Sequence, residues 1–145
     1  MYRPDVPEID NYDLRATLRS VFAGGLTADE AKAILDITRR AAAADHKTDI
    51  AEMTMLLRIK DLLAQMADEV TLPVTGHFDR VVTSDLSPGA RELAFACAYL
   101  VMDQDLALVD EERTLANTLA TELGIDESRQ HELSATIDRL VRLAS

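Results

Sequence analysis

The stretch 101–112 reads VMDQDLALVDEE, and the stretch 41–52 reads AAAADHKTDIAE. Each starts in an Ala-rich or apolar helical pattern, passes through an acidic turn and enters a second helical pattern. In both, an Asp near the end of the first pattern is followed seven residues later by a Glu, so that Asp45 corresponds to Asp105 and Glu52 to Glu112. The two stretches therefore predict two helical hairpins with matching acidic turns, sixty residues apart along the chain.

Helical spacing of apolar residues continues outward from these hairpins over nearly the whole chain. Seven helices are expected: one ending at Gly24-Gly25, one running to about Ala44, one ending near Val70, a short one over 77–84, one starting at Pro88, one stopping at Gly124 and one after Asp126. The segment Leu93–Met102 is uninterruptedly apolar, which predicts that this helix is the central, enclosed one. On the sixth helix, a stripe at four-residue spacing is expected to face inward: Leu115, Leu119 and Leu123.

Polar residues at the predicted helix ends agree with these boundaries. Thr27 with Glu30, and Asp49 with Glu52, have the spacing of a capping box, in which each side chain accepts a backbone N–H of the other residue. Ser87 precedes Pro88, a residue that is well tolerated at the first helical position. These signals predict an all-α fold, a compact bundle of about seven helices.

A shift of sixty residues aligns caps and acidic residues as well as apolar ones. Thr27 falls on Ser87, and the core positions Ile59 and Leu63 fall on Leu119 and Leu123. The expected organisation is an extended arm over 1–11 and a single domain over 12–145. This domain contains two pseudo-repeated units, 12–70 and 72–125, and a closing helix over 126–144.

Composition limits the function classes. The 145 residues are 48% hydrophobic and carry a formal charge of −11, which argues against a nucleic-acid partner, because such binding needs clustered cations, and against an electrostatic contact with an anionic membrane. The single Cys97 cannot form an intrachain disulfide, and its apolar surroundings predict an inert buried thiol. No apolar run is long enough for direct membrane insertion, and the N-terminus lacks a signal-peptide core. The expected localisation is cytoplasmic.

The acidic turns offer oxygen ligands, which prefer the hard divalent cations Ca²⁺, Mg²⁺ and Mn²⁺. The candidate metal ligands are Asp45, Asp49, Glu52, Asp105, Asp110 and Glu112. Asp45 and Asp105 stand near helix C-termini, where the helix dipole disfavours an anion and some local partner is needed. The spacing is not that of an EF-hand, because Leu108 stands where that loop needs Gly and Thr114 where it needs Glu.

Two readings of these residues stay open. In one, the turns bind a cation; in the other, Glu52 and Glu112 merely cap helices while loop N–H groups satisfy the Asp side chains. The sequence contains no Glu-x-x-His pair, no phosphate-binding Gly loop, and no nucleophile with a neighbouring base. An enzyme is therefore not expected, and neither is a catalytic residue or an organic cofactor.

The doubled helix–Asp-x₆-Glu–helix pattern, with Glu-Leu-Gly-Ile-Asp at 122–126, resembles the TerB-like family, named for tellurite-resistance protein B. The resemblance covers about residues 26–140. Family members typically read Asp-Gly, an apolar residue and then Glu; this chain has His46 and Leu106 in place of Gly, and Thr48 in the apolar position that Leu108 fills in the second copy. The resemblance implies a helical domain with a metal-associated acidic surface and a role in tellurite or stress resistance, through a protein partner at the membrane.

The sequence thus leads to two expectations about function. The first is a non-enzymatic cation-binding or sensing module that also docks a partner protein. The alternative is a purely structural protein-interaction domain with no metal. The oligomeric state, the metal and the partner are not encoded in any recognisable motif.

Overall fold

The computed structural model describes residues 9–42, 50–67, 86–102 and 110–143, and within these ranges the chain is all-helical. The six helices are α1 (Asn11–Val21), α2 (Ala28–Ala42), α3 (Ile50–Met66), α4 (Pro88–Met102), α5 (Asp110–Glu122) and α6 (Glu127–Leu143). The expected short helix over 77–84 lies outside the described residues. None of the six helices has the length and apolarity that a membrane crossing requires.

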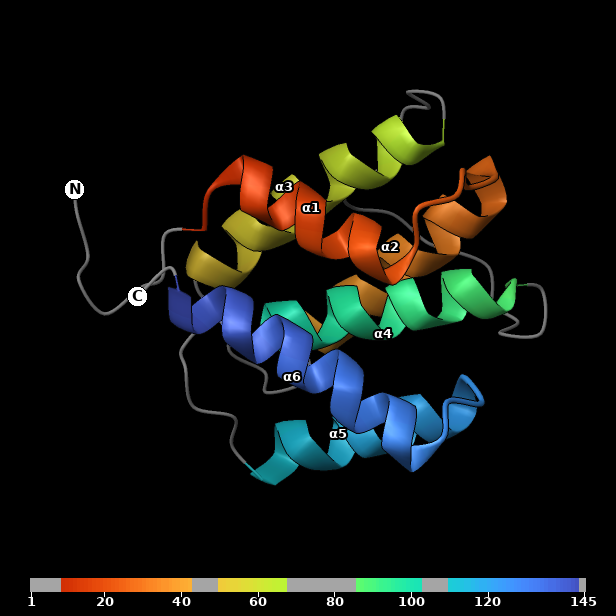
Figure 1. Ribbon diagram of the computed structural model, residues 1–145, viewed down its shortest axis with the longest axis vertical. Coiled ribbons are helices and arrows are strands. Elements are labelled where there is room, and N and C mark those ends of the chain that lie inside the picture. The colour runs from red at the N-terminus through yellow and green to blue at the C-terminus, as the bar shows by residue number, and fades with distance from the viewer. Residues whose placement is uncertain (1–8, 43–49, 68–85, 103–109, 144–145) are drawn as a thin grey trace.

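Helix α4 is the centre of the bundle and packs against each of the other five helices (Figure 1). Its residues Leu93–Met102 are all buried, as the apolar run predicts. In the view of Figure 1, α1 and α6 lie in front of α4, α2 lies behind it, and α3 and α5 lie above and below. The most extensive helix–helix contact joins α2 to α4. The two helices that precede the acidic turns therefore form the middle of the molecule.

Capping residues set the helix boundaries largely as predicted. The Glu30 N–H donates to Thr27 Oγ1 over 3.1 Å, and the Thr27 N–H donates back to Glu30 Oε1 over 3.1 Å. Ser87 caps α4, since its Oγ accepts the Ala90 N–H over 3.3 Å. Asp126 caps α6, with its Oδ1 accepting the Arg129 N–H over 2.7 Å. The capping box at Thr27 and the two single caps are thus confirmed.

Glu30 links the starts of two helices. Its Oε1 belongs to the capping box of α2, and its Oε2 accepts the Ser87 N–H just before α4, over 3.2 Å. Partial burial raises the pKa of Glu30, but the hydrogen bonds from Thr27 and Ser87 oppose this and bring it below the usual 4.5. One carboxylate therefore fastens the N-termini of the two central helices together.

The helix ends differ from the sequence prediction in two places and agree with it at Gly124. Helix α3 ends at Met66 rather than near Val70, because the Met66 carbonyl accepts the Leu26 N–H over 3.0 Å. Helix α1 already ends at Val21, before Gly24-Gly25, and neither glycine has a positive φ. Gly124 does adopt a left-handed φ of 73°, and the Ile125 N–H bonds back to the Ala120 carbonyl over 2.9 Å. Helix α5 thus stops at Gly124 as predicted, through a Schellman-type ending.

The predicted inward stripe of α5 is wrong in part. The buried positions are Ala116, Ala120 and Leu123, whereas Leu115 and Leu119 are only half-buried. The small alanines let α5 pack closely on α4, and this rotates the larger leucines toward the edge of the contact. The consequence is that two leucine side chains remain available beside the core.

Candidate functional site

The acidic turns fall largely outside the described residues, which end at Ala42 and Met102 and resume at Ile50 and Asp110. Asp45, Asp49 and Asp105 therefore lie outside the described residues. Glu52 occupies the third position of α3, as the capping-box spacing predicts, and Asp110 and Glu112 occupy the first and third positions of α5. These three residues belong to first helical turns, the part of a helix where its dipole favours negative charge.

The helix bounds follow the offset of sixty residues seen in the sequence. Helix α4 begins and ends sixty residues after α2, and α5 begins sixty residues after α3. The first turns of α3 and α5 both lie toward the left end of the bundle in Figure 1, one in the upper half and one at the lower edge. The fold therefore places both helix starts that carry predicted ligands toward one end of the molecule.

A groove between α2 and α5 has a volume of about 170 Å³. Both helices pack on α4 but hardly on each other. Four apolar side chains and three polar ones line the groove: Ile37, Ala41, Leu115 and Leu119, with Arg40, Thr118 and Glu122. The half-buried leucines of α5 thus face a space that no other described helix fills.

Arg40 at this groove is held by a buried acid. The side chain of Asp36 is 0% exposed; its Oδ1 accepts a hydrogen bond from Arg39 over 2.8 Å, and its Oδ2 lies 2.8 Å from an Arg40 terminal nitrogen. The Arg40 contact lacks hydrogen-bond alignment, so the attraction is mainly electrostatic. A buried carboxylate needs such compensation. The side chain of Arg40 remains 56% exposed. The ion pair with Asp36 therefore holds an accessible guanidinium at the edge of the groove.

Asp36 is not among the residues predicted from the sequence to be functional. The signal was present, because Asp36 is followed by Arg39 and Arg40 at helical spacing and is flanked by the core residues Leu35 and Ile37. An acid inside an apolar helical run, with two bases one turn later, predicts a buried ion pair.

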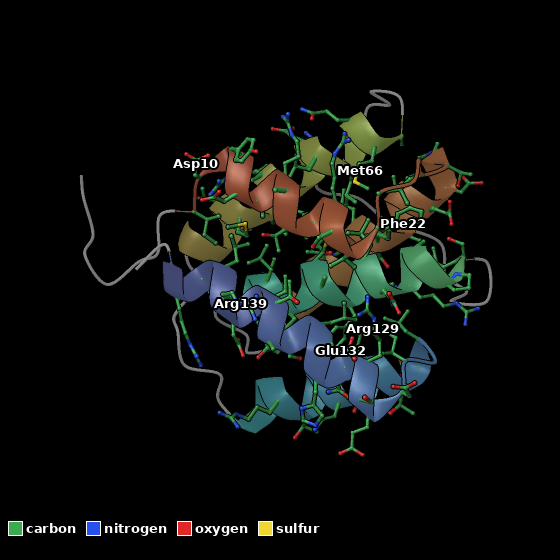
Figure 2. The ribbon with its side chains drawn as sticks, in the orientation of Figure 1. Asp10, Phe22, Met66, Arg129, Glu132 and Arg139 are labelled. Atoms are coloured by element: carbon green, nitrogen blue, oxygen red, sulfur yellow. The ribbon has the colours of Figure 1, made fainter. Side chains whose placement is uncertain are left out.

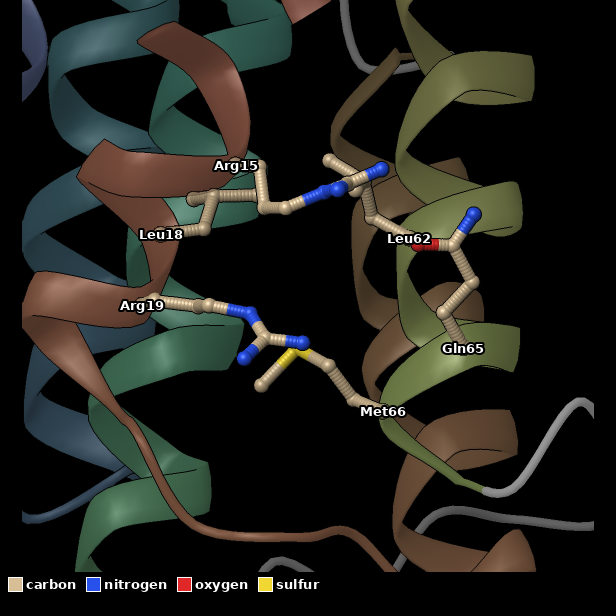
Figure 3. Close-up of a pocket in the computed structure, with 6 residues that line it drawn as sticks. All are labelled: Arg15, Leu18, Arg19, Leu62, Gln65 and Met66. Atoms are coloured by element: carbon tan, nitrogen blue, oxygen red, sulfur yellow. The ribbon is translucent and has the colours of Figure 1, made fainter. Parts of the chain in front are cut away.

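A second hollow, between α1 and α3, is too small to be a binding site. Figure 3 shows Arg15 and Arg19 reaching from α1 toward Gln65 and Met66 of α3. The space has a volume of about 10 Å³, roughly that needed by one water molecule. It is best regarded as a packing gap between the stems of two surface arginines.

Other reactive groups among the described residues form no site of their own. Burial raises the pKa of the Cys97 thiol to about 12, so the thiol is inert, as predicted. His131 is exposed, 3.8 Å from an equally exposed Glu127. The Arg129 guanidinium on α6 donates two hydrogen bonds, of 2.9 and 3.0 Å, to the Glu92 carboxylate of α4. It also donates a hydrogen bond to Glu132, one turn away on α6 (Figure 2). Within the described ranges no three His, Cys, Asp or Glu residues gather in a way that could hold a metal.

Comparison with known proteins adds no assignment to this geometry. No protein-family model, no curated protein and no solved structure matches the chain.

Proposed function

We propose that this chain is a TerB-like, non-enzymatic cytoplasmic module that binds or senses a divalent cation at its two acidic turns and docks a partner protein. The proposed ligands are Asp45, Asp49, Glu52, Asp105, Asp110 and Glu112. The biological setting that goes with this proposal is tellurite or stress resistance, with a partner at the membrane.

The observation that carries the proposal is the offset of sixty residues between helix bounds. Helices α2 and α4 match at both ends, and α3 and α5 match at their starts, so the acidic stretches 43–49 and 103–109 connect corresponding helices. This agreement supports two pseudo-repeated units. An acidic turn retained in both units at one position, near helix C-termini where carboxylates are disfavoured, favours a ligand for those carboxylates.

Calorimetric titration with Ca²⁺, Mg²⁺ and Mn²⁺ tests this function. The full chain is expected to bind one of these ions with a saturable heat, and Asp105→Asn is expected to weaken that binding by about tenfold or more, since a charged ligand is removed. The matched control is Asp61→Asn, which changes an exposed carboxylate within α3. Absence of saturable binding for all three ions, or an equal loss in the control variant, would rule out the cation role.

The groove between α2 and α5 favours the second candidate, a protein-interaction domain with no metal. Leu115 and Leu119 are half-buried beside a hollow of about 170 Å³, a surface suited to contact with another protein. In this case Glu52 and Glu112 only stabilise the first turns of α3 and α5 and bind no cation. The metal-free candidate would be favoured if the chain binds no cation in the titration and still binds its partner protein equally well with and without a chelator.

A further inference from the structure

The two halves of the bundle bury their corresponding helices to different extents. Helix α3 packs on both α2 and α4, whereas its counterpart α5 packs on α4 but hardly on α2. Ile59 and Met55 of α3 are 0% and 2% exposed, while Leu119 and Leu115, sixty residues later, are half-buried. The contact of α5 with α2 would correspond to that of α3 with α4. The groove therefore occupies the place of a missing helix–helix contact.

The size of the groove limits what can fill it. Its volume of about 170 Å³ is below the roughly 300–1,000 Å³ of small-molecule sites. Space of this size suits one or two aliphatic side chains, and the floor formed by Ile37, Ala41, Leu115 and Leu119 is apolar. Because the equivalent space in the first half is filled by helix packing, an amphipathic helix is the matching occupant.

The charge at the groove's edge selects among such helices. Arg40 is fixed by Asp36 through one terminal nitrogen, and a guanidinium has further N–H donors in the same plane. A carboxylate can therefore pair with Arg40 without displacing Asp36. The net charge of −11 repels a strongly acidic partner, and Glu122 lines the same groove. Recognition of negative charge is thus confined to the Arg40 end.

We propose that the α2–α5 groove binds an amphipathic helix of a partner protein, with an aliphatic side chain inserted beside Leu115, Leu119 and Ile37 and an acidic side chain one turn away paired with Arg40. This inference rests on the docking half of the proposed function and names the chemistry of the partner. It does not depend on the cation.

The test uses three synthetic stapled helical peptides, which differ only in two positions one turn apart: Leu with Glu, Leu with Lys, and Ala with Glu. Binding to the full chain is followed through the methyl NMR signals of Leu115, Leu119 and Ile37. The Leu–Glu peptide is expected to bind about fivefold more tightly than the Leu–Lys peptide, the upper range for an exposed ion pair. The Ala–Glu peptide, which lacks the anchor, is expected to leave the groove signals unmoved.

Arg40→Gln is expected to abolish the preference for Glu over Lys, whereas Arg142→Gln, at an exposed position of α6, is expected to keep it. Thermal unfolding would check that each variant is folded. The comparison of the three peptides is made on the wild-type chain and does not depend on any variant. Groove binding with equal or greater affinity for the Leu–Lys peptide would overturn the proposed chemistry while docking itself stands. No groove shifts with any peptide would overturn docking at this site, and tighter binding of free hexanoate than of the peptide would indicate a small-ligand pocket instead.

Discussion

The Glu30 carboxylate carries a pH-dependent part of the stability. Its pKa is below 4.5 in the folded chain, so its contribution is fully present above the pKa of the unfolded chain and is lost as the pH falls through the lower, folded value. Glu30→Gln should therefore lower the unfolding free energy by about 1 kcal/mol at pH 7, where the wild-type carboxylate accepts backbone N–H groups at two helix starts. Urea unfolding of both proteins at pH 7 and pH 3.5 measures this difference.

The difference between wild type and Glu30→Gln should shrink at pH 3.5, because on acidification the unfolded chain binds a proton at Glu30 before the folded chain does. Asp29→Asn, which alters the exposed neighbouring acid, serves as the control. A difference that stays constant, or grows, on acidification would show that Glu30 does not act through its charge.

Phe22 and Gly89 are in close contact, and one added carbon atom at Gly89 would clash with the ring. The Phe22 ring lies over the first turn of α4, and a Cβ on Gly89 would come within 2.4 Å of the ring's Cδ2 (Figure 2). Gly89→Ala should therefore destabilise the wild type by about 1–3 kcal/mol through overpacking. In a Phe22→Ala background the same change should stabilise, by up to about 1 kcal/mol, because Ala is the better helix former. A double-mutant cycle in urea checks this reversal of sign; equal effects in both backgrounds would refute the contact.

At the scale of elements, the sequence predicted helix existence better than helix orientation. The caps at Thr27, Ser87 and Asp126 act locally, so their side chains define helix starts without knowledge of the fold. The enclosure of α4 could likewise be predicted from one stretch of sequence, its own apolar run. The end of α3 depends on Leu26, forty residues away in sequence, and a pattern read along the chain does not show such a bond.

The rotation of α5 about its own axis could not be predicted from the sequence pattern either. A stripe of leucines and a stripe of alanines both fit helical spacing, and the close approach of α5 to α4 selects Ala116 and Ala120 for burial. The groove arises from this choice, so neither it nor the anchored Arg40 was predicted as part of a site. Among the predicted ligands, Glu52 and Glu112 stand in first helical turns as expected, and Asp110 is the first residue of α5. The role of these three residues stays a prediction.

The different burial of α3 and α5 gives a prediction for paired truncations. Leu63→Ala in α3, where the side chain is 0% exposed, should cost about 2–5 kcal/mol. Leu119→Ala in α5 should cost at most about 1 kcal/mol, because the half-buried side chain already borders a hollow. Equilibrium unfolding in urea measures both. A cost for Leu119→Ala comparable to that for Leu63→Ala would mean that the groove is part of the core rather than an open surface.

At the scale of the whole molecule, the positions of the helices follow in part the offset of sixty residues between their bounds. Helices α2 and α4, whose bounds differ by sixty residues, form the most extensive contact in the bundle. Helices α3 and α5 start toward the same end of the molecule (Figure 1). With a net charge of −11, the chain has the electrostatic field to attract cations generally, so a specific site must be distinguished from this diffuse attraction.

Paramagnetic relaxation by Mn²⁺ makes this distinction most directly. At substoichiometric Mn²⁺ and physiological ionic strength, backbone amide signals of residues 45–52 and 105–112 should broaden first. Those beside other exposed acids, such as Asp29, Asp61 and Glu127, should remain sharp. Uniform broadening over all acidic segments, or none at the two turns, would contradict the claim that this fold presents two equivalent cation-binding turns.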